Sequence, residues 1–158
     1  MKFLAAMTAG LVLCGAAAMP ALAKSDETVP LGMTVGHGWT RQTKARGQTT
    51  PAYFTIHNAG TTPDTLVSTS CPIAHHTLLL DRSGQAVGGL VIKPGETVTL
   101  APDRTHLMLQ QNRFRFYAHA MIPCSVDFLD AGKVILYLHV EPDDAKAYEQ
   151  VRRPIVKN

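Results

Sequence analysis

The chain is poor in charged and aromatic residues. Asp, Glu, Lys and Arg make up 17% of its 158 residues, Phe, Trp and Tyr make up 6%, and Trp occurs once. The formal net charge is +3 with the histidines counted as neutral, an excess too small to indicate a nucleic-acid-binding surface. Because 46% of the residues are hydrophobic, the composition also excludes a disordered chain, and the length predicts one globular domain.

Long helical patterns and the common catalytic motifs are absent as well. The sequence has no pair of carboxylates in an apolar setting, no glycine-rich phosphate loop and no G-x-S-x-G motif. Cys71 lies near His75 and His76, but no orienting carboxylate accompanies them, and a disulfide to Cys124 would remove the thiol. We therefore expect a protein that is not an enzyme.

The N-terminal segment has the three parts of a secretory signal peptide. A charged start at Lys2 precedes an apolar stretch that ends in Ala-Leu-Ala at residues 21–23. We expect residues 1–23 to be removed, and residues 24–158 to form the mature periplasmic protein without a membrane span. Two alternatives stay open: a retained membrane span, and a lipoprotein acylated at Cys14, which the large Leu13 before it disfavours.

The mature chain keeps two cysteines, Cys71 and Cys124. In an oxidising compartment, two remaining cysteines most often form one disulfide. This bridge would close a loop of about fifty residues and contribute about 4 kcal/mol in the chain-entropy model. The alternative is a pair of free thiols that holds a soft metal.

Short runs of strand type alternate with turn residues. Twelve glycines and ten prolines are spread along the chain, and turn signals recur about every eight to twelve residues. This pattern predicts an all-β, antiparallel sandwich or barrel in one domain from about Val29 to Val140, with a short helix considered only at residues 143–153. The expected strands are residues 39–43, 52–57, 64–70, 76–80, 87–92, 97–100, 105–109, 113–117, 124–129 and 133–140.

Residues 105–109 read T-H-L-M-L and contain the sharpest local signal for chemistry. In a strand, Leu107 and Leu109 would face the core, and His106 and Met108 would stand side by side on the opposite face. An imidazole and a thioether are suitable ligands for copper, and the soft thioether favours Cu(I). The alternative is that Met108 packs beneath a loop and His106 is an ordinary surface residue.

Six segments in this order along the chain carry a family resemblance. They are Trp39 with Arg41, 52–60 (AYFTIHNAG), 64–74 (DTLVSTSCPIA), 92–100 (IKPGETVTL), 105–109 (THLML) and 131–134 (AGKV). Together they resemble the PCu(A)C family of periplasmic copper chaperones. The resemblance implies a cupredoxin-like antiparallel β-sandwich that carries Cu(I) toward the copper centres of terminal oxidases. It also implies a partner protein that donates or receives copper.

The resemblance carries His106 and Met108 over as copper ligands, but the other half of the family's site is missing. Where the family reads V-E-L-H-x-M, the histidine position falls at Leu80, and residues 81–91 contain no methionine. The hairpin there is also several residues shorter. A metal-free interaction domain that kept the fold and lost the copper is therefore the alternative function.

Other histidines are available as substitutes. His76 shares a strand face with Leu80 and is the third ligand that we select, although about 13 Å of strand separates the two positions. His75 and His37 are further candidates. The remaining side chains of this kind, His57, His119, His139 and Met121, are interpreted as ordinary strand or turn residues.

Overall fold

The computed structural model describes residues 32–148, which contain nine strands and no helix. The expected signal peptide at residues 1–23 lies outside the described residues. The described part of the tail considered for a helix, residues 143–148, is not helical, and the rest of that tail also lies outside. The strands are β1 (Met33–Arg41), β2 (Thr50–Asn58), β3 (Asp64–Ser70), β4 (Ala74–Leu80), β5 (Leu90–Ile92), β6 (Thr97–Thr99), β7 (His106–Asn112), β8 (Met121–Phe128) and β9 (Gly132–Glu141).

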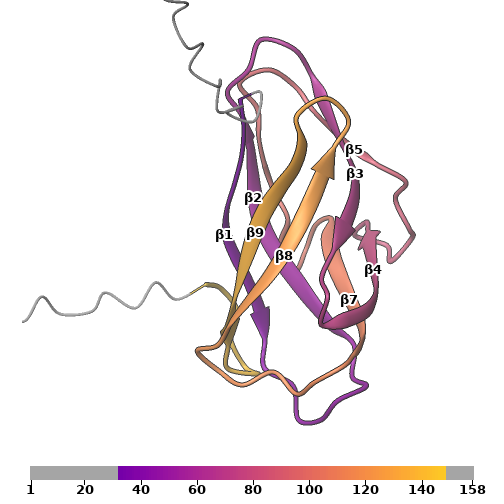
Figure 1. Ribbon diagram of the computed structural model, residues 1–158, viewed down its shortest axis with the longest axis vertical. Helices are drawn as coiled ribbons and strands as arrows, with labels where there is room; N and C mark the ends of the chain where they lie inside the picture. The colour runs from indigo at the N-terminus through magenta and orange to yellow at the C-terminus, as the bar shows by residue number, and fades with distance from the viewer. Residues whose placement is uncertain (1–31, 149–158) are drawn as a thin grey trace, which may run out of the picture.

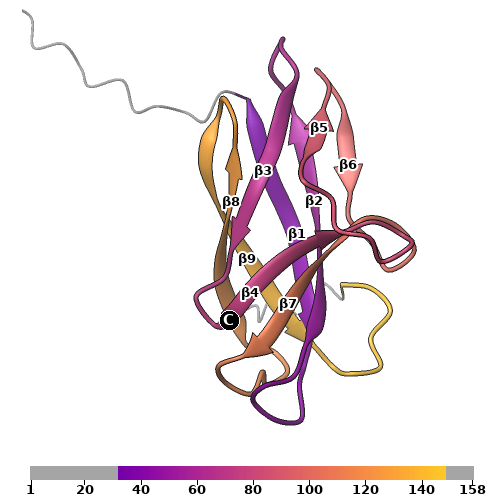
Figure 2. The same cartoon turned by 90° about the vertical axis from the view of Figure 1, so that its right-hand side faces the viewer.

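The strands form one curled sheet in the order β4-β7-β2-β1-β9-β8-β3-β5, and β6 pairs with β2. The sheet bends over itself, so that β4, β7 and β2 lie across the core from β9, β8 and β3 (Figure 1; Figure 2). The all-β sandwich is therefore confirmed, and most pairs are antiparallel. One pair is parallel: β1 runs parallel to β9 over Trp39–Arg41.

Most expected strands are present with shifted ends, and residues 64–70 are a strand with the expected bounds. The expected strand at residues 113–117 is absent, because the backbone there bonds to neighbouring loops: Arg113 N–H donates to the carbonyl of Ile73, and Phe116 N–H donates to Thr43 Oγ1. The turn expected after Met121 is also wrong. Pro123 lies inside β8, opposite Tyr137.

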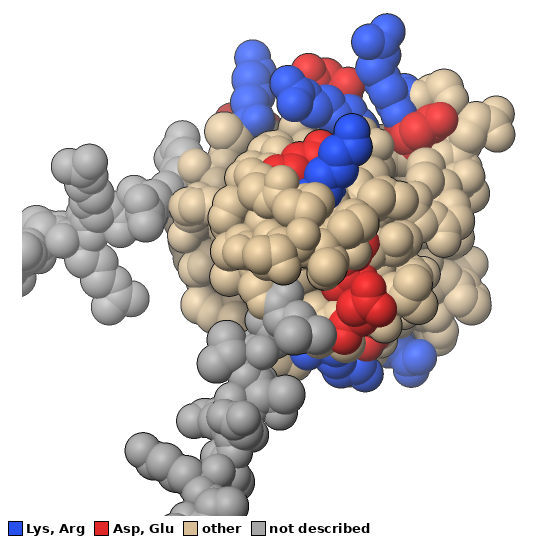
Figure 3. Space-filling model, turned by 90° about the horizontal axis from the view of Figure 1, so that it is seen from above, with Lys and Arg blue, Asp and Glu red and all other residues tan. Residues whose placement is uncertain are grey.

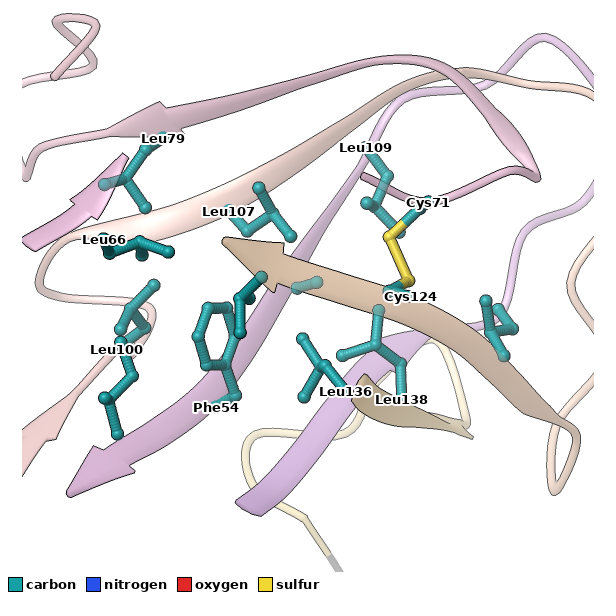
Figure 4. Packing of buried hydrophobic residues seen from close by; sticks show 14 of the residues in the cluster. Phe54, Leu66, Cys71, Leu79, Leu100, Leu107, Leu109, Cys124, Leu136 and Leu138 are labelled. Carbon is teal, nitrogen blue, oxygen red and sulfur yellow. A yellow bond between two sulfur atoms is a disulfide. The ribbon is translucent and has the colours of Figure 1, made fainter. Parts of the chain in front are cut away.

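The core lies between the two layers of the sheet. Phe54, Leu107 and Leu109 project from β2 and β7 toward Leu136 and Leu138 of β9 (Figure 4), and each of these side chains is 0–2% exposed. Strict alternation of inward and outward side chains explains this burial, since residues two apart share a face. The core therefore leaves the odd-numbered residues of β2 and, as far as Gln110, the even-numbered residues of β7 directed outward. The alternation of β7 ends at Gln111, whose φ is 52°, and Asn112 is buried.

A disulfide joins Cys71 to Cys124 with an S–S distance of 2.05 Å and a Cα–Cα distance of 4.3 Å. Cys71 follows β3, where the chain crosses from one layer to the other, and Cys124 lies on β8. The predicted disulfide is confirmed, and the alternative of a free thiol pair is wrong. The bridge ties the β3–β4 crossover to the layer that it leaves.

Charged side chains on the end of the molecule seen in Figure 3 are sparse and of both signs. Lys and Arg atoms lie beside Asp and Glu atoms, and most of the visible face is uncharged. Between residues 32 and 148 no helix is long and apolar enough to cross a membrane.

Candidate metal centre

The strand β7 separates its side chains as its sequence predicts. Leu107 and Leu109 are fully buried in the core, while His106 and Met108 are half-buried on the outer face of the sheet. Two residues of extended chain span about 6.6 Å, so the imidazole and the thioether are neighbours on that face. The predicted outer-face position of both residues is confirmed, and Met108 is not sealed in the interior.

A backbone carbonyl next to His106 selects the tautomer of its neutral ring. His106 Nδ1 lies 3.0 Å from the carbonyl oxygen of Arg104. Because a carbonyl oxygen only accepts, Nδ1 carries the proton and donates it in this bond. The lone pair of the neutral ring is then on Nε2, which is the atom free to coordinate a metal.

Aromatic side chains cover the sheet beside His106. The Tyr53 ring centroid lies 6.3 Å from that of His106 and 4.6 Å from that of Trp39, and the Arg41 guanidinium lies 5.9 Å from the Trp39 ring. Burial raises the pKa of the Tyr53 hydroxyl, and the positive charge of Arg41 lowers it by less. Tyr53 is therefore a neutral phenol at pH 7, and the wall beside His106 carries no negative charge.

The strands on either side of β7 place apolar residues opposite the two candidate ligands. Leu80 of β4 pairs with His106, and Leu78 pairs with Met108. On the other side, Pro51 of β2 pairs with Met108. Leu80 is the position at which the resemblance expects a histidine, so this register places the missing ligand directly across from His106.

His76 lies on the same outer face but farther along β4. It pairs with Gln110, so it is a diagonal neighbour of Met108, at about 7–8 Å between Cα atoms. Four residues separate His76 from Leu80, and about 13 Å of strand therefore separates it from the position opposite His106. The structure brings His76 toward Met108 and does not bring it next to His106.

The other histidines lie elsewhere. His75 is exposed at the start of β4, and His37 lies in β1 with a φ of 53°. Within residues 32–148 no three His, Cys, Asp or Glu side chains are grouped closely enough to hold a metal ion. The chain thus supplies two close donors on an open face, which suits a soft ion that exchanges ligands.

One His–Met pair was missed by sequence reasoning. Met121 pairs directly with His139 across β8 and β9, and Met121 is 56% exposed. The two residues are 18 positions apart, so only the strand register brings them together. The alternation of side chains predicts which face of its own strand each residue occupies. Nothing in the sequence predicts that Met121 and His139 lie opposite each other.

The fold places the chain in the structural class of the PCuAC domains, which confirms the resemblance in the sequence. The apo PCuAC domain from PmoF1 is 22% identical with a TM-score of 0.65, covering 70% of this chain and 94% of that one. The copper-bound PCuAC domain from PmoF2 is 19% identical with a TM-score of 0.64, covering 70% and 93%. The CuI form of DR1885 from Deinococcus radiodurans is 21% identical with a TM-score of 0.59, covering 73% and 81%.

Within that class, the sequence model described as “Putative lipoprotein LpqE-like” matches residues 33–140. The match covers more than half of the chain, and the chain belongs to the LpqE-like family. No curated protein sequence matches it.

Proposed function

We propose that the protein is an exported copper chaperone that binds Cu(I) through His106 and Met108. The observation that carries the proposal is that His106, whose Nδ1 is bonded to Arg104 and whose Nε2 is left for a metal, shares the outer face of β7 with Met108. The copper-bound PmoF2 domain and the CuI form of DR1885 share the fold, and this likeness supports copper as the cargo. The activity is binding and transfer, without catalysis.

An incomplete site suits transfer between proteins. Both ligands are neutral, and thioether sulfur favours Cu(I). Since Leu80 and Leu78 supply no donor on the facing strand, the remaining coordination positions are open to a ligand from a copper-donating or copper-receiving partner. A partner's ligand can therefore join the ion before His106 and Met108 leave it. Delivery to the copper centres of terminal oxidases is the expected destination.

A Cu(I) titration of the mature chain against a chromogenic chelator tests the site. His106→Ala and Met108→Leu are each expected to weaken binding at least tenfold, about 1.4 kcal/mol, because each removes one of two close donors. His57→Ala and Met121→Leu remove the same kinds of side chain elsewhere and should leave the affinity unchanged. Equal, feeble uptake by all of these proteins would contradict the proposal.

Two further variants in the same titration define the ligand set. Leu80→His places an imidazole directly opposite His106 and is expected to tighten Cu(I) binding at least tenfold. His76→Ala tests the third proposed ligand, whose loss should weaken binding less than the loss of His106, since His76 is near Met108 only. An unchanged affinity in His76→Ala would limit the site to His106 and Met108.

The second candidate function is a metal-free interaction domain. It is favoured by the apolar side chains opposite the site, of which Leu78 is 39% exposed. If this function holds, the wild-type chain takes up no stoichiometric Cu(I), and Leu80→His alone gains binding. The chelator titration therefore separates the two functions.

The proposal of export is supported by the N-terminal segment and by the family description. We propose cleavage after Ala23, and the lipoprotein named in the family description keeps acylation at Cys14 as the alternative. Intact-mass measurement of the exported chain distinguishes them, since signal cleavage gives a chain that begins at Lys24. A lipid-modified chain that begins at Cys14 would contradict the proposed cleavage.

A further inference from the structure

A basic surface lies at the end of the molecule where the β1–β2 and β7–β8 loops meet. Both views place these two loops together at the lower end (Figure 1; Figure 2). Between them and the start of β4 is an open hollow of about 570 Å³, lined among others by Arg46, His75, Asn112, Arg113 and Phe114. None of these side chains takes part in the proposed copper site.

Backbone hydrogen bonds hold the rim of the hollow in place. Asn112, the last residue of β7, accepts from Gly47 N–H at 2.7 Å and donates its own N–H to Gln48 at 2.9 Å. Arg113 N–H donates to the carbonyl of Ile73 at 2.7 Å. The backbone segments that carry Arg46 and Arg113 are thus both attached to the end of β7, so both arginines stand on one rim of the hollow.

The hollow is positively charged without compensation. Its lining contains two arginines and a histidine and no Asp or Glu. The one ion pair found in the part of the chain that the structure describes joins Lys133 to Asp127, so neither Arg46 nor Arg113 is paired there. An arginine guanidinium binds a carboxylate through two parallel hydrogen bonds. Two neighbouring arginines that have no acidic partner are therefore complementary to the carboxylate of a ligand.

Asn112 adds an unpartnered amide to this basic lining. Its side chain is 2% exposed, and neither Oδ1 nor Nδ2 has a hydrogen-bond partner. Asn58, also buried, shows the usual arrangement: its Nδ2 donates to the carbonyls of Thr62 and Ile92, and its Oδ1 accepts from Gly60 N–H. Because an unsatisfied buried polar group is costly, Asn112 points to a ligand with both a donor and an acceptor.

We propose that this hollow binds an acidic peptide segment of a partner protein. A carboxylate of the segment pairs with Arg46 and Arg113, and one of its peptide groups offers the N–H and C=O that the Asn112 amide lacks. Phe114, whose side chain is 66% exposed, provides an apolar wall for a neighbouring side chain of the peptide. The open shape suits a segment of a macromolecule better than a small molecule, which is usually enclosed.

NMR titration of the mature, isotope-labelled chain with an acetylated and amidated hexapeptide of Asp and Glu with one Phe tests the site. Shifts are expected at residues 46, 75 and 112–114, and Arg46→Ala and Arg113→Ala should each weaken binding about tenfold. Arg82→Ala makes the same charge change outside the hollow and is the control. Equal binding of the matched Asn and Gln peptide, or an equal loss in Arg82→Ala, would overturn the proposal.

Two further measurements separate a peptide site from a purely structural amide and from a site for small anions. Asn112→Leu removes the unpartnered amide and is expected to raise the unfolding temperature, because a buried polar group without a hydrogen-bond partner destabilises the fold. The same substitution should weaken peptide binding, since the amide is then retained for binding at a cost in stability. A lower unfolding temperature with unchanged peptide affinity would indicate an internally satisfied amide and overturn the assignment. Inorganic phosphate that displaces the peptide at equal concentration would also overturn it in favour of a small-oxyanion site.

Discussion

Asp64 shows how a single side chain holds the end of the sandwich together. It is 7% exposed, and its carboxylate accepts hydrogen bonds from the backbone N–H groups of Thr65, Asp130 and Ala131 at 2.6–3.0 Å. Burial raises the pKa of Asp64, but these N–H donors together lower it more, so its pKa lies below the ordinary value of 3.8. One residue at the start of β3 thus anchors the β8–β9 turn.

Asp64→Asn is expected to cost about 1.5–3 kcal/mol of unfolding free energy at pH 7, because charge-assisted bonds are lost. A carboxylate with a depressed folded pKa stabilises the fold above its unfolded pKa, and this stability is lost as pH falls through the folded pKa. The difference between wild type and variant should therefore shrink below about pH 4. Urea denaturation at several pH values measures this difference in unfolding free energy.

Asp127→Asn is the control, because Asp127 forms a partly exposed ion pair with Lys133, and its loss should cost less than about 1 kcal/mol. A difference between wild type and Asp64→Asn that does not change with pH would contradict the role assigned to Asp64.

At the scale of the element, the parallel contact between β1 and β9 depends on a close backbone approach. A Cβ at Gly38 would collide with the carbonyl oxygen of Tyr137 and lie 2.7 Å from Leu136 Cδ1. Both atoms belong to β9, which pairs with β1 from Trp39 onward. Gly38 therefore lets β9 come close enough to pair with β1, which remains paired with β2 at Trp39 and Thr40, and this contact joins the two layers.

Gly38→Ala is expected to destabilise the protein by about 1–3 kcal/mol, since overpacking against β9 forces the strands apart. Gly36→Ala is the matched control two residues earlier in β1, because its Cβ would meet no atom within 4 Å. The control should change stability by less than about 1 kcal/mol. Denaturant unfolding of both variants measures the difference, and equal stability of the two would show that the close approach is not needed.

The elements were largely predictable from local patterns. Apolar alternation in residues 52–57, 64–70 and 133–140 marks strands that the structure contains. Residues 113–117 are also rich in aromatic side chains and form no strand, because the Arg113 N–H donates to the carbonyl of Ile73 and the Phe116 N–H to the hydroxyl of Thr43 instead of to a partner strand. Strand propensity describes how well a residue fits into a sheet, but a segment forms a strand only where another strand is available to pair with it.

For the molecule as a whole, the disulfide limits how far the unfolded chain can expand. Cys71 and Cys124 are separated by 53 residues, and closing a loop of this length contributes about 4 kcal/mol in the chain-entropy model. The bridge also lies where β3 crosses to β4, the strand that faces the candidate copper ligands. Its loss should therefore affect both global stability and the position of β4.

Cys71→Ser combined with Cys124→Ser is expected to lower the unfolding free energy by about 2–5 kcal/mol. Thermal and denaturant unfolding of the oxidised, reduced and double-substituted chains measures this effect. The reductant should destabilise the wild type and leave the double variant unchanged. A reduced wild type as stable as the oxidised protein would show that the folded crossover needs no covalent restraint.

The sequence by itself determined the strand pattern, the core face of β7 and the cysteine pair, because period-two alternation and composition act within a few residues. Only the tertiary structure decided which residues oppose each other. It placed Leu80 across from His106, Met121 across from His139 and Asn112 beside Arg46. These neighbours come from distant parts of the chain, and strand register, which sets them, depends on the packing of the whole sheet.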